Sequence, residues 1–147
     1  MDREKLLKEL KPFAEHIARA MCCPFYLVGS ILTKEDPRDI DLYGRMEDRW
    51  FEIHFGPVAD WEEQGKTGHW GRARHSWSRF CVVLTGWGIQ MTGLNLDVQV
   101  KPASNFDRHI EERILVAEGL IPASKQHQQM IPAVIFMEKA DGVEEVT

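Results

Sequence analysis

The sequence predicts an α+β (α/β-like) fold in which a small mixed sheet is flanked by helices. Apolar residues recur at spacings of three and four over residues 2–21 and 70–91, which is the periodicity of amphipathic helices. Short runs of strand-forming residues stand at 25–28, 39–43 and 95–100, with glycine or proline close to their ends. Helical and strand patterns therefore share one chain segment, as an α+β domain requires.

Length and composition indicate one domain spanning residues 1–147. Of the 147 residues 44% are hydrophobic and 28% charged, which is the ordinary globular range, and the chain is long enough to bury its own core. We expect only the acidic tail from about residue 139 to be mobile. The net charge of −5 argues against nonspecific coating of nucleic acid, because that mode of binding needs a basic surface.

The cysteines and the hydropathy pattern favour a cytoplasmic protein without a membrane segment. The three cysteines are Cys22, Cys23 and Cys81, and an odd number with two adjacent members makes a poor disulfide framework. We therefore expect buried free thiols in a reducing compartment. No uninterrupted apolar stretch approaches the length that spans a bilayer.

The first half of the chain reads as a helix, two strands and further helical segments. Pro24 prevents the helix over 2–21 from running on, and Gly29 ends the strand over 25–28. A polar connection containing proline leads to the strand over 39–43, which we expect to end at Gly44. A helix over 46–55 is then broken by Gly56, and residues 58–69 are polar enough for a loop or a short helix.

A longer helix over 70–91 has two distinct faces. Its apolar face includes Trp77 and Leu84, whereas Arg72 and Arg79 fall on a polar face together with His75 and Ser76. The polar face is either an ordinary solvated helix surface or a basic wall that faces a phosphate-bearing substrate. The glycines at 86 and 88 could interrupt this helix, and the adjacent valines at 82 and 83 favour a strand locally.

Beyond residue 94 the sequence predicts a strand, a helix and a final strand. Residues 95–100 alternate between apolar and polar side chains, the pattern of a half-buried strand that Pro102 closes. Residues 105–119 have the spacing of a helix with Gly119 as its C-cap. Residues 131–137 are strand-forming but contain Pro132, which favours an edge position.

Three aspartates on the predicted strands are the candidate functional residues. Period-two geometry directs Asp39 and Asp41 to the same face of their strand, where two carboxylates repel unless a cation lies between them. Asp97 lies within the later strand, where aspartate is disfavoured. Each aspartate alone is consistent with a solvent-facing side chain or a strand end, but the three together indicate a metal site.

The ordered motifs resemble the nucleotidyltransferase superfamily typified by DNA polymerase beta, in particular its small stand-alone members. The resemblance covers residues 20–100 and rests on three segments: Leu27-Val28-Gly29-Ser30, Asp39-Ile40-Asp41-Leu42 and Leu96-Asp97-Val98. Glycine-serine and Asp-x-Asp are each common, but the ordered set with apolar flanks is moderately specific. The resemblance implies a nucleotidyltransferase palm fold.

The resemblance also implies a chemistry. Asp39, Asp41 and Asp97 would bind two Mg²⁺ ions, and ATP is the most favoured of the nucleoside triphosphates as substrate. Gly29 would let the phosphates approach the backbone, and Ser30, at the start of a helix, would donate a hydrogen bond to them. Lys34 and Arg38 would supply positive charge near the phosphates. The acceptor hydroxyl, on a protein, an RNA end or a small molecule, is not specified.

Two alternatives to an active enzyme stand beside this hypothesis. The chain could retain the fold as a catalytically weak or inactive module that binds a nucleotide or a partner protein. It could also be an unrelated α+β interaction protein whose aspartates face solvent. A chain of 147 residues would be a minimal enzyme, so a homo-oligomer or a partner subunit is a further expectation.

Overall fold

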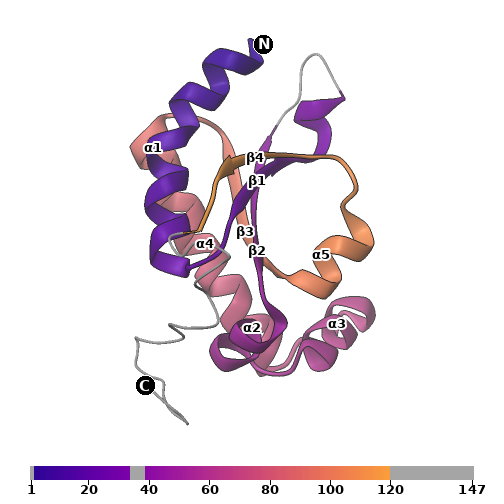
Figure 1. Cartoon of the computed structure of the whole chain (residues 1–147). Coiled ribbons are helices and arrows are strands. Elements are labelled where there is room, and N and C mark those ends of the chain that lie inside the picture. The colour runs from indigo at the N-terminus through magenta and orange to yellow at the C-terminus, as the bar shows by residue number, and fades with distance from the viewer. Residues whose placement is uncertain (1, 34–38, 120–147) are drawn as a thin grey trace, which may run out of the picture.

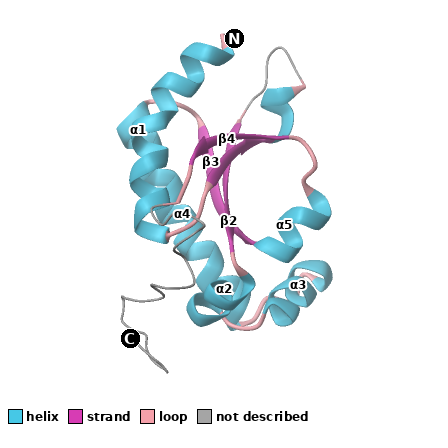
Figure 2. Cartoon of the chain, viewed as in Figure 1, coloured by secondary structure: helices cyan, strands magenta, loops and turns pink. Residues whose placement is uncertain are grey.

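Helices and strands are interspersed along the chain in this computed structural model, which describes residues 2–33 and 39–119 (Figure 1, Figure 2). In chain order the elements are α1 (Arg3–Met21), β1 (Phe25–Val28), the 3-10 helix η1 (Gly29–Leu32), β2 (Ile40–Met46), α2 (Asp48–Phe55), α3 (Val58–Thr67), α4 (Arg72–Thr92), β3 (Leu96–Pro102), α5 (Ala103–His109) and β4 (Arg113–Ala117).

The four strands form one mixed sheet in the order β3-β2-β1-β4. The central strand β1 pairs antiparallel with β2 and with β4, while β2 and β3 run parallel. A parallel pair needs a long crossover, and α2, α3 and α4 occupy the connection between β2 and β3. The predicted α+β class with a small mixed sheet flanked by helices is confirmed.

One face of the sheet is apolar and carries the core. Along β2 and β3 buried and partly exposed residues alternate without exception, so the apolar side chains share one face. In Figure 1, α1 and α4 lie on one side of the sheet, and η1 and α5 lie on the other. Residues from α1, α4 and the strands join in one buried cluster that includes Leu10, Phe13, Leu42, Leu84 and Val98.

The N-terminal helix forms as its sequence predicts. Asp2 caps α1 by accepting hydrogen bonds from the backbone N–H groups of Glu4 and Lys5 at 3.0 and 3.3 Å. The helix ends at Met21, and the left-handed backbone of its C-cap Cys22 (φ 56°) turns the chain toward β1. Cys22 is exposed, whereas Cys23 and Cys81 are buried, so the expectation of buried free thiols is correct for two of the three cysteines.

Helix α4 runs without interruption through both of its glycines. A Cβ atom on Gly88 would lie 2.9 Å from the side chains of Phe13 and Leu96, so the glycine lets α4 approach α1 and β3 closely. Gly86 faces open space on the outer side. Val82 and Val83, also on this outer side, remain about two-thirds exposed, at 66% and 67%. The strand considered for this pair of valines does not form.

Two expectations from the sequence are corrected, and one alternative is decided. β2 does not end at Gly44 but continues to Met46, and a Cβ at Gly44 would lie 2.6 Å from the ring of Phe25, so packing explains this glycine. Of the loop and the short helix left open for residues 58–69, the short helix forms, as α3, which ends at Thr67. Residues 105–119 are not one helix, because α5 ends at His109 and Arg113–Ala117 is the strand β4. The strand expected over 131–137 and the acidic tail lie outside the described residues.

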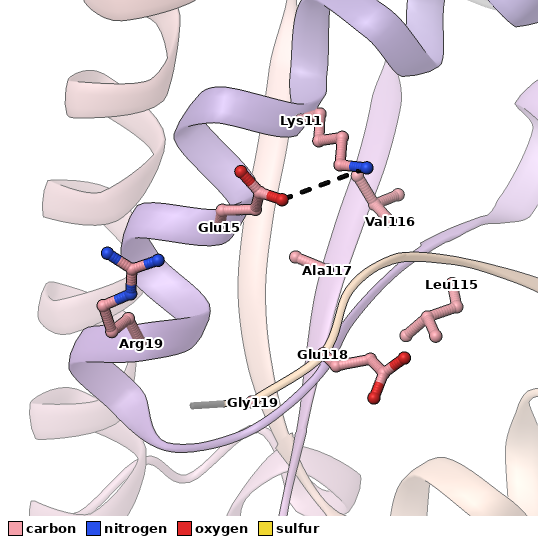
Figure 3. Close-up of a pocket in the computed structure, with 8 residues that line it drawn as sticks. All are labelled: Lys11, Glu15, Arg19, Leu115, Val116, Ala117, Glu118 and Gly119. Atoms are coloured by element: carbon pink, nitrogen blue, oxygen red, sulfur yellow. Dashed lines mark ion pairs between the residues drawn. The ribbon is translucent and has the colours of Figure 1, made fainter. Parts of the chain in front are cut away.

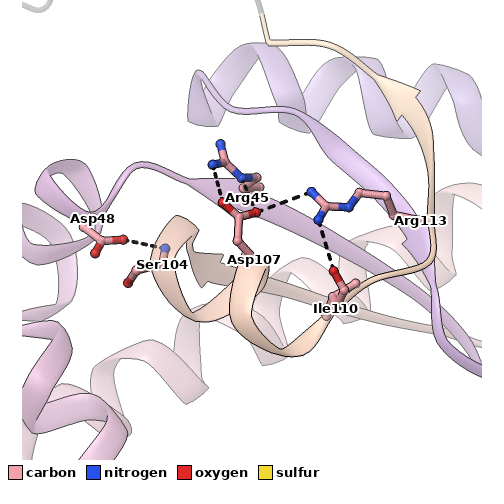
Figure 4. Close-up of polar contacts among 6 residues, drawn as sticks. All are labelled: Arg45, Asp48, Ser104, Asp107, Ile110 and Arg113. Carbon is pink, nitrogen blue, oxygen red and sulfur yellow. Dashed lines mark hydrogen bonds and ion pairs between the residues drawn. The ribbon is translucent and has the colours of Figure 1, made fainter.

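Charged contacts fix α5 against the sheet (Figure 4). The Arg45 guanidinium donates from Nε and Nη2 to the two carboxylate oxygens of Asp107 at 2.8 and 2.7 Å. Arg113 reaches Asp107 Oδ1 at 3.4 Å and donates to the Ile110 carbonyl at 3.1 Å. Because Arg45 belongs to β2 and Arg113 to β4, Asp107 joins α5 to two strands.

A membrane span was not expected from the sequence. Over residues 2–33 and 39–119 no helix is both long and apolar enough to cross a bilayer.

Candidate functional site

Two of the predicted aspartates lie side by side on the polar face of the sheet. Asp41 on β2 is the register partner of Asp97 on the parallel strand β3. The residues that flank them along each strand are buried, so both carboxylates point away from the core. The sequence predicted a shared site for these residues, and the pairing of β2 with β3 brings them together.

Asp39 lies just before β2, which begins at Ile40. Its side chain is exposed, and its Oδ1 accepts a hydrogen bond from the Asn95 side-chain amide at 3.0 Å. Asn95 comes immediately before β3, so the hydrogen bond ties the beginnings of the two parallel strands together. Asp39 thus stands at the same end of the sheet as the pair formed by Asp41 and Asp97.

The three aspartates carry negative charge that neighbouring cations in the described structure do not fully neutralise. The pKa of Asp41 is raised from 3.8 to about 6, first by burial, then by the charge of Asp97 and then by that of Asp39. Lys101 acts in the opposite direction but is the weakest of the four influences. A cation bound here would relieve the repulsion, because it favours the ionised form of each carboxylate.

The turn after β1 lies directly against Asp41. Val28, the last residue of β1, is the register partner of Asp41, and Gly29 follows it with φ +81°. A Cβ on Gly29 would lie 2.4 Å from Oδ2 of Asp41, so only glycine leaves this carboxylate in its place. Ser30 is partly buried in the same turn. The helix expected near Ser30 is a 3-10 helix of only four residues, Gly29–Leu32.

The donor set suits magnesium, which prefers oxygen ligands and keeps several waters. The side chains are not arranged as a closed metal cage, however. The Gln99 amide donates to both oxygens of Asp97, at 3.3 and 3.1 Å. Over residues 2–33 and 39–119, no three or more His, Cys, Asp or Glu side chains are grouped so that they could hold a metal ion. Binding would therefore require the Asp97 carboxylate to exchange the Gln99 amide for the cation.

Of the four cations named from the sequence, Arg72 and Arg79 belong to the described residues. Lys34 and Arg38 lie outside the described residues. Arg72 and Arg79 are exposed on α4, and neither side chain forms a hydrogen bond or an ion pair with another described residue. Their predicted contact with substrate stays a prediction.

Lys101 and Tyr43 are residues of this face that the sequence analysis missed. Lys101 follows Asp97 and Gln99 at alternate positions of β3, and Tyr43 follows Asp41 in the same way on β2. The period-two rule that paired the aspartates would have placed both side chains on the same face. Burial, together with the charges of Asp41 and Asp97, raises the pKa of the Tyr43 hydroxyl and keeps it protonated.

A separate hollow lies between α1 and β4 (Figure 3). Its charged lining comes from Lys11, Glu15, Arg19 and Glu118, and Lys11 Nζ lies 4.0 Å from a carboxylate oxygen of Glu15. Two cations thus face two anions. The charges of this hollow balance, in contrast to those around Asp41.

The chain matches no protein-family model, no curated protein and no solved structure. The functional argument therefore depends on the geometry and electrostatics of the site itself.

Proposed function

We propose that this protein is a Mg²⁺-dependent nucleotidyltransferase that moves a nucleoside monophosphate from a nucleoside triphosphate, most readily ATP, to a hydroxyl acceptor. The observation that carries the proposal is the register pair of Asp41 and Asp97 beside the Gly29 turn, where the pKa of Asp41 is raised to about 6. Paired acids with residual negative charge next to a close backbone approach suit a metal-bound polyphosphate.

In this proposal Asp39, Asp41 and Asp97 hold the metal. Two bound Mg²⁺ ions would supply activation of the acceptor hydroxyl and stabilisation of the charge that develops on the leaving pyrophosphate. Gly29 leaves room for phosphate oxygens beside the backbone, and the Ser30 hydroxyl donates a hydrogen bond to them. Lys34 and Arg38, in the connection that leads to β2, contribute positive charge. Asn95 restrains Asp39 through the bond at 3.0 Å.

The test follows transfer of the labelled α-phosphate of each nucleoside triphosphate to an RNA 3′ end, a protein and a small alcohol, together with pyrophosphate release. Asp41→Asn and Asp97→Asn should lower turnover by at least about 100-fold, since loss of even a partner of a metal ligand costs 10–100-fold. Asp60→Asn is the matched control, because the Asp60 side chain is exposed on α3 and forms no hydrogen bond with another described residue. Unchanged turnover in Asp41→Asn would refute the assignment.

The hydrogen bonds from Gln99 favour a second candidate function, a nucleotide-binding module with little or no turnover. An amide that donates to both oxygens of Asp97 competes with a metal for that carboxylate. Calorimetric titration with ATP and Mg²⁺ separates the two functions when combined with the transfer assay. Binding by the wild-type protein without transfer to any acceptor supports the module, whereas transfer that Asp97→Asn abolishes supports the enzyme.

A further inference from the structure

Lys101 is a partly buried cation without a polar partner in the described structure. It lies on β3, on the same face as Asp97, and its side chain forms no hydrogen bond or ion pair with another described residue. Its ammonium nitrogen instead lies 5.3, 5.6 and 5.5 Å from the ring centres of Tyr43, Trp61 and Trp77. Lysines are rarely taken out of water unless they are paired, so this arrangement calls for an explanation.

The aromatic rings compensate only part of the lost hydration. A cation–π contact is weaker than the hydration that an ammonium group loses on burial, although it strengthens where water is excluded. The Lys101 pKa is nevertheless lowered, first by burial and then by the nearby charge of Arg74. Arg74 itself is held over Trp61, 4.0 Å from the ring centre, and donates from Nε to the Trp61 carbonyl at 2.7 Å. Lys101 is thus held in place without a direct ion pair to any described side chain.

The order of charges along this face of β3 indicates that the partner of Lys101 is an anion. Asp97 and Lys101 are four residues apart on one face of β3, which separates their Cα atoms by about 13 Å at the usual strand rise. The carboxylates of Asp97 and Asp41 still act on the Lys101 ammonium and raise its pKa. The face therefore runs from a cation-binding end at the acids to an anion-binding end at Lys101, with Tyr43 between them on β2.

We infer that Lys101 binds the phosphates of a polyphosphate whose metal-bound part lies at Asp41 and Asp97. The inference rests on the proposed function for its substrate class and adds Lys101 to Lys34 and Arg38 as a cation for the phosphates. Lysine is suited to this role because its ammonium offers three donors on a flexible stem. Lys101 is a substrate-binding residue in this account and transfers no proton.

Inorganic tripolyphosphate with Mg²⁺ is the probe, because it contains no nucleotide to transfer. Lys101→Met should weaken its binding, measured by calorimetry, about tenfold or more, since the lost contact is a charge-assisted hydrogen bond. Lys101→Arg keeps the charge and should retain most of the affinity. Lys66→Met is the matched control, because Lys66 is exposed in the last turn of α3.

A second measurement on the wild-type protein avoids any variant that fails to fold. Limited acylation of lysines followed by peptide mass spectrometry should show that tripolyphosphate and Mg²⁺ protect Lys101, while Lys66 stays reactive. Equal affinity of Lys101→Met and wild type, or acylation of Lys101 that the probe does not slow, overturns the inference. Transfer activity with an unchanged KM for ATP in Lys101→Met would overturn it while leaving the proposed function intact. Protection of Lys101 by the probe in a protein that transfers no nucleotide would support the inference and refute the proposed function.

Discussion

At the scale of single residues, Gly29 and Asp41 act as one unit. Gly29 has a left-handed backbone, φ +81°, and its missing side chain makes room for the Asp41 carboxylate. Gly68 has nearly the same backbone, φ +78°, but a Cβ there would meet nothing within 4 Å. Substitution at both glycines places a side chain on left-handed backbone, but only substitution at Gly29 also brings that side chain against Asp41. Comparing the two therefore separates the effect of backbone conformation from the effect of contact with the acid.

Alanine at these two positions should have equal effects on stability and different effects on the site. Gly29→Ala and Gly68→Ala each place a side chain on left-handed backbone, which costs about 1–2 kcal/mol. Only Gly29→Ala should also displace the Asp41 carboxylate, whose oxygen would lie 2.4 Å from the new Cβ. Urea unfolding measures the first effect, and carbon NMR of the Asp41 carboxyl during a pH titration measures the second. Identical Asp41 titration curves in the two variants would contradict this account.

At the scale of elements, α4 closes the free edge of β3. The Thr85 hydroxyl donates to the Val98 carbonyl at 3.1 Å and accepts from the Val98 N–H at 2.9 Å. Two turns earlier on the helix, Trp77 Nε1 donates to the Val100 carbonyl at 2.6 Å. Side chains of a helix thus supply the hydrogen bonds that a further strand would otherwise provide, and they protect an edge that could pair with another chain.

Thr85→Val should destabilise the protein by about 2–3 kcal/mol, because it leaves a backbone donor and a backbone acceptor of β3 unpaired. Valine has nearly the same shape as threonine, so the loss reports on the two hydrogen bonds. Thr85→Ser keeps the hydroxyl and should cost less than about 1 kcal/mol. Guanidinium unfolding of both variants tests the difference. A larger loss in Thr85→Ser than in Thr85→Val would mean that packing of the methyl group, rather than the hydrogen bonds, holds α4 at this edge.

The elements that the sequence predicts well are those whose pattern is long. The helix over 2–21 has five turns of periodic leucine, phenylalanine and isoleucine and was placed within one residue of α1. Residues 105–119 are the opposite case, since Ile110, Ile114 and Ala117 satisfy helical spacing while Arg113–Ala117 equally suits a strand. Pairing with β1 decides between the two, and that pairing is a long-range contact which no local pattern contains.

The candidate site also combines features that the sequence predicts with features that it does not. The sequence grouped Asp41 with Asp97 because aspartate is disfavoured in strands and because the ordered motifs resemble a known superfamily. The pairing of β2 with β3 makes the two residues register partners, which alternation within each strand could not predict. The environment of Lys101 could not be predicted, because it depends on Trp61 in α3 and Trp77 in α4 meeting beside β3. Nor could the bond of Gln99 to Asp97, which depends on side-chain conformation rather than on pattern.

At the scale of the whole molecule, the two faces of the sheet have opposite effects on stability. The apolar face stabilises the fold through burial against α1 and α4. The polar face holds acids that repel one another, and the resulting energy opposes folding. Two carboxylates on that side of the sheet, Asp41 on β2 and Asp107 on α5, have pKa values shifted in opposite directions. Arg45 lowers the pKa of Asp107, whereas burial and neighbouring acids raise that of Asp41.

The stability of the protein should therefore depend on pH in a way that Asp41 controls. The folded pKa of Asp41 is about 6 against an ordinary value of 3.8, so the folded state binds more protons than the unfolded state between these pH values. The contribution of Asp41 to stability is most favourable below pH 4, declines as the pH rises toward 6 and is lost above that. Asp41→Asn removes the penalty and should be more stable than wild type at pH 7 by about 1 kcal/mol, after allowance for solvent screening of a half-exposed group.

Urea unfolding at pH 4, 5, 6 and 7 measures this prediction, and Asp107→Asn provides the control of opposite sign. The folded pKa of Asp107 is lowered, so its contribution is present at neutral pH and is lost only as the pH falls through that lowered value. Asp107→Asn should thus be less stable than wild type at pH 7, by roughly 0.5 kcal/mol for an exposed ion pair. If Asp41→Asn were no more stable than wild type at pH 7, or if its advantage persisted at pH 4, the acids would not repel in the folded protein. The electrostatic reason for a cation at this face would then be removed, because a metal binds there in part by relieving that repulsion.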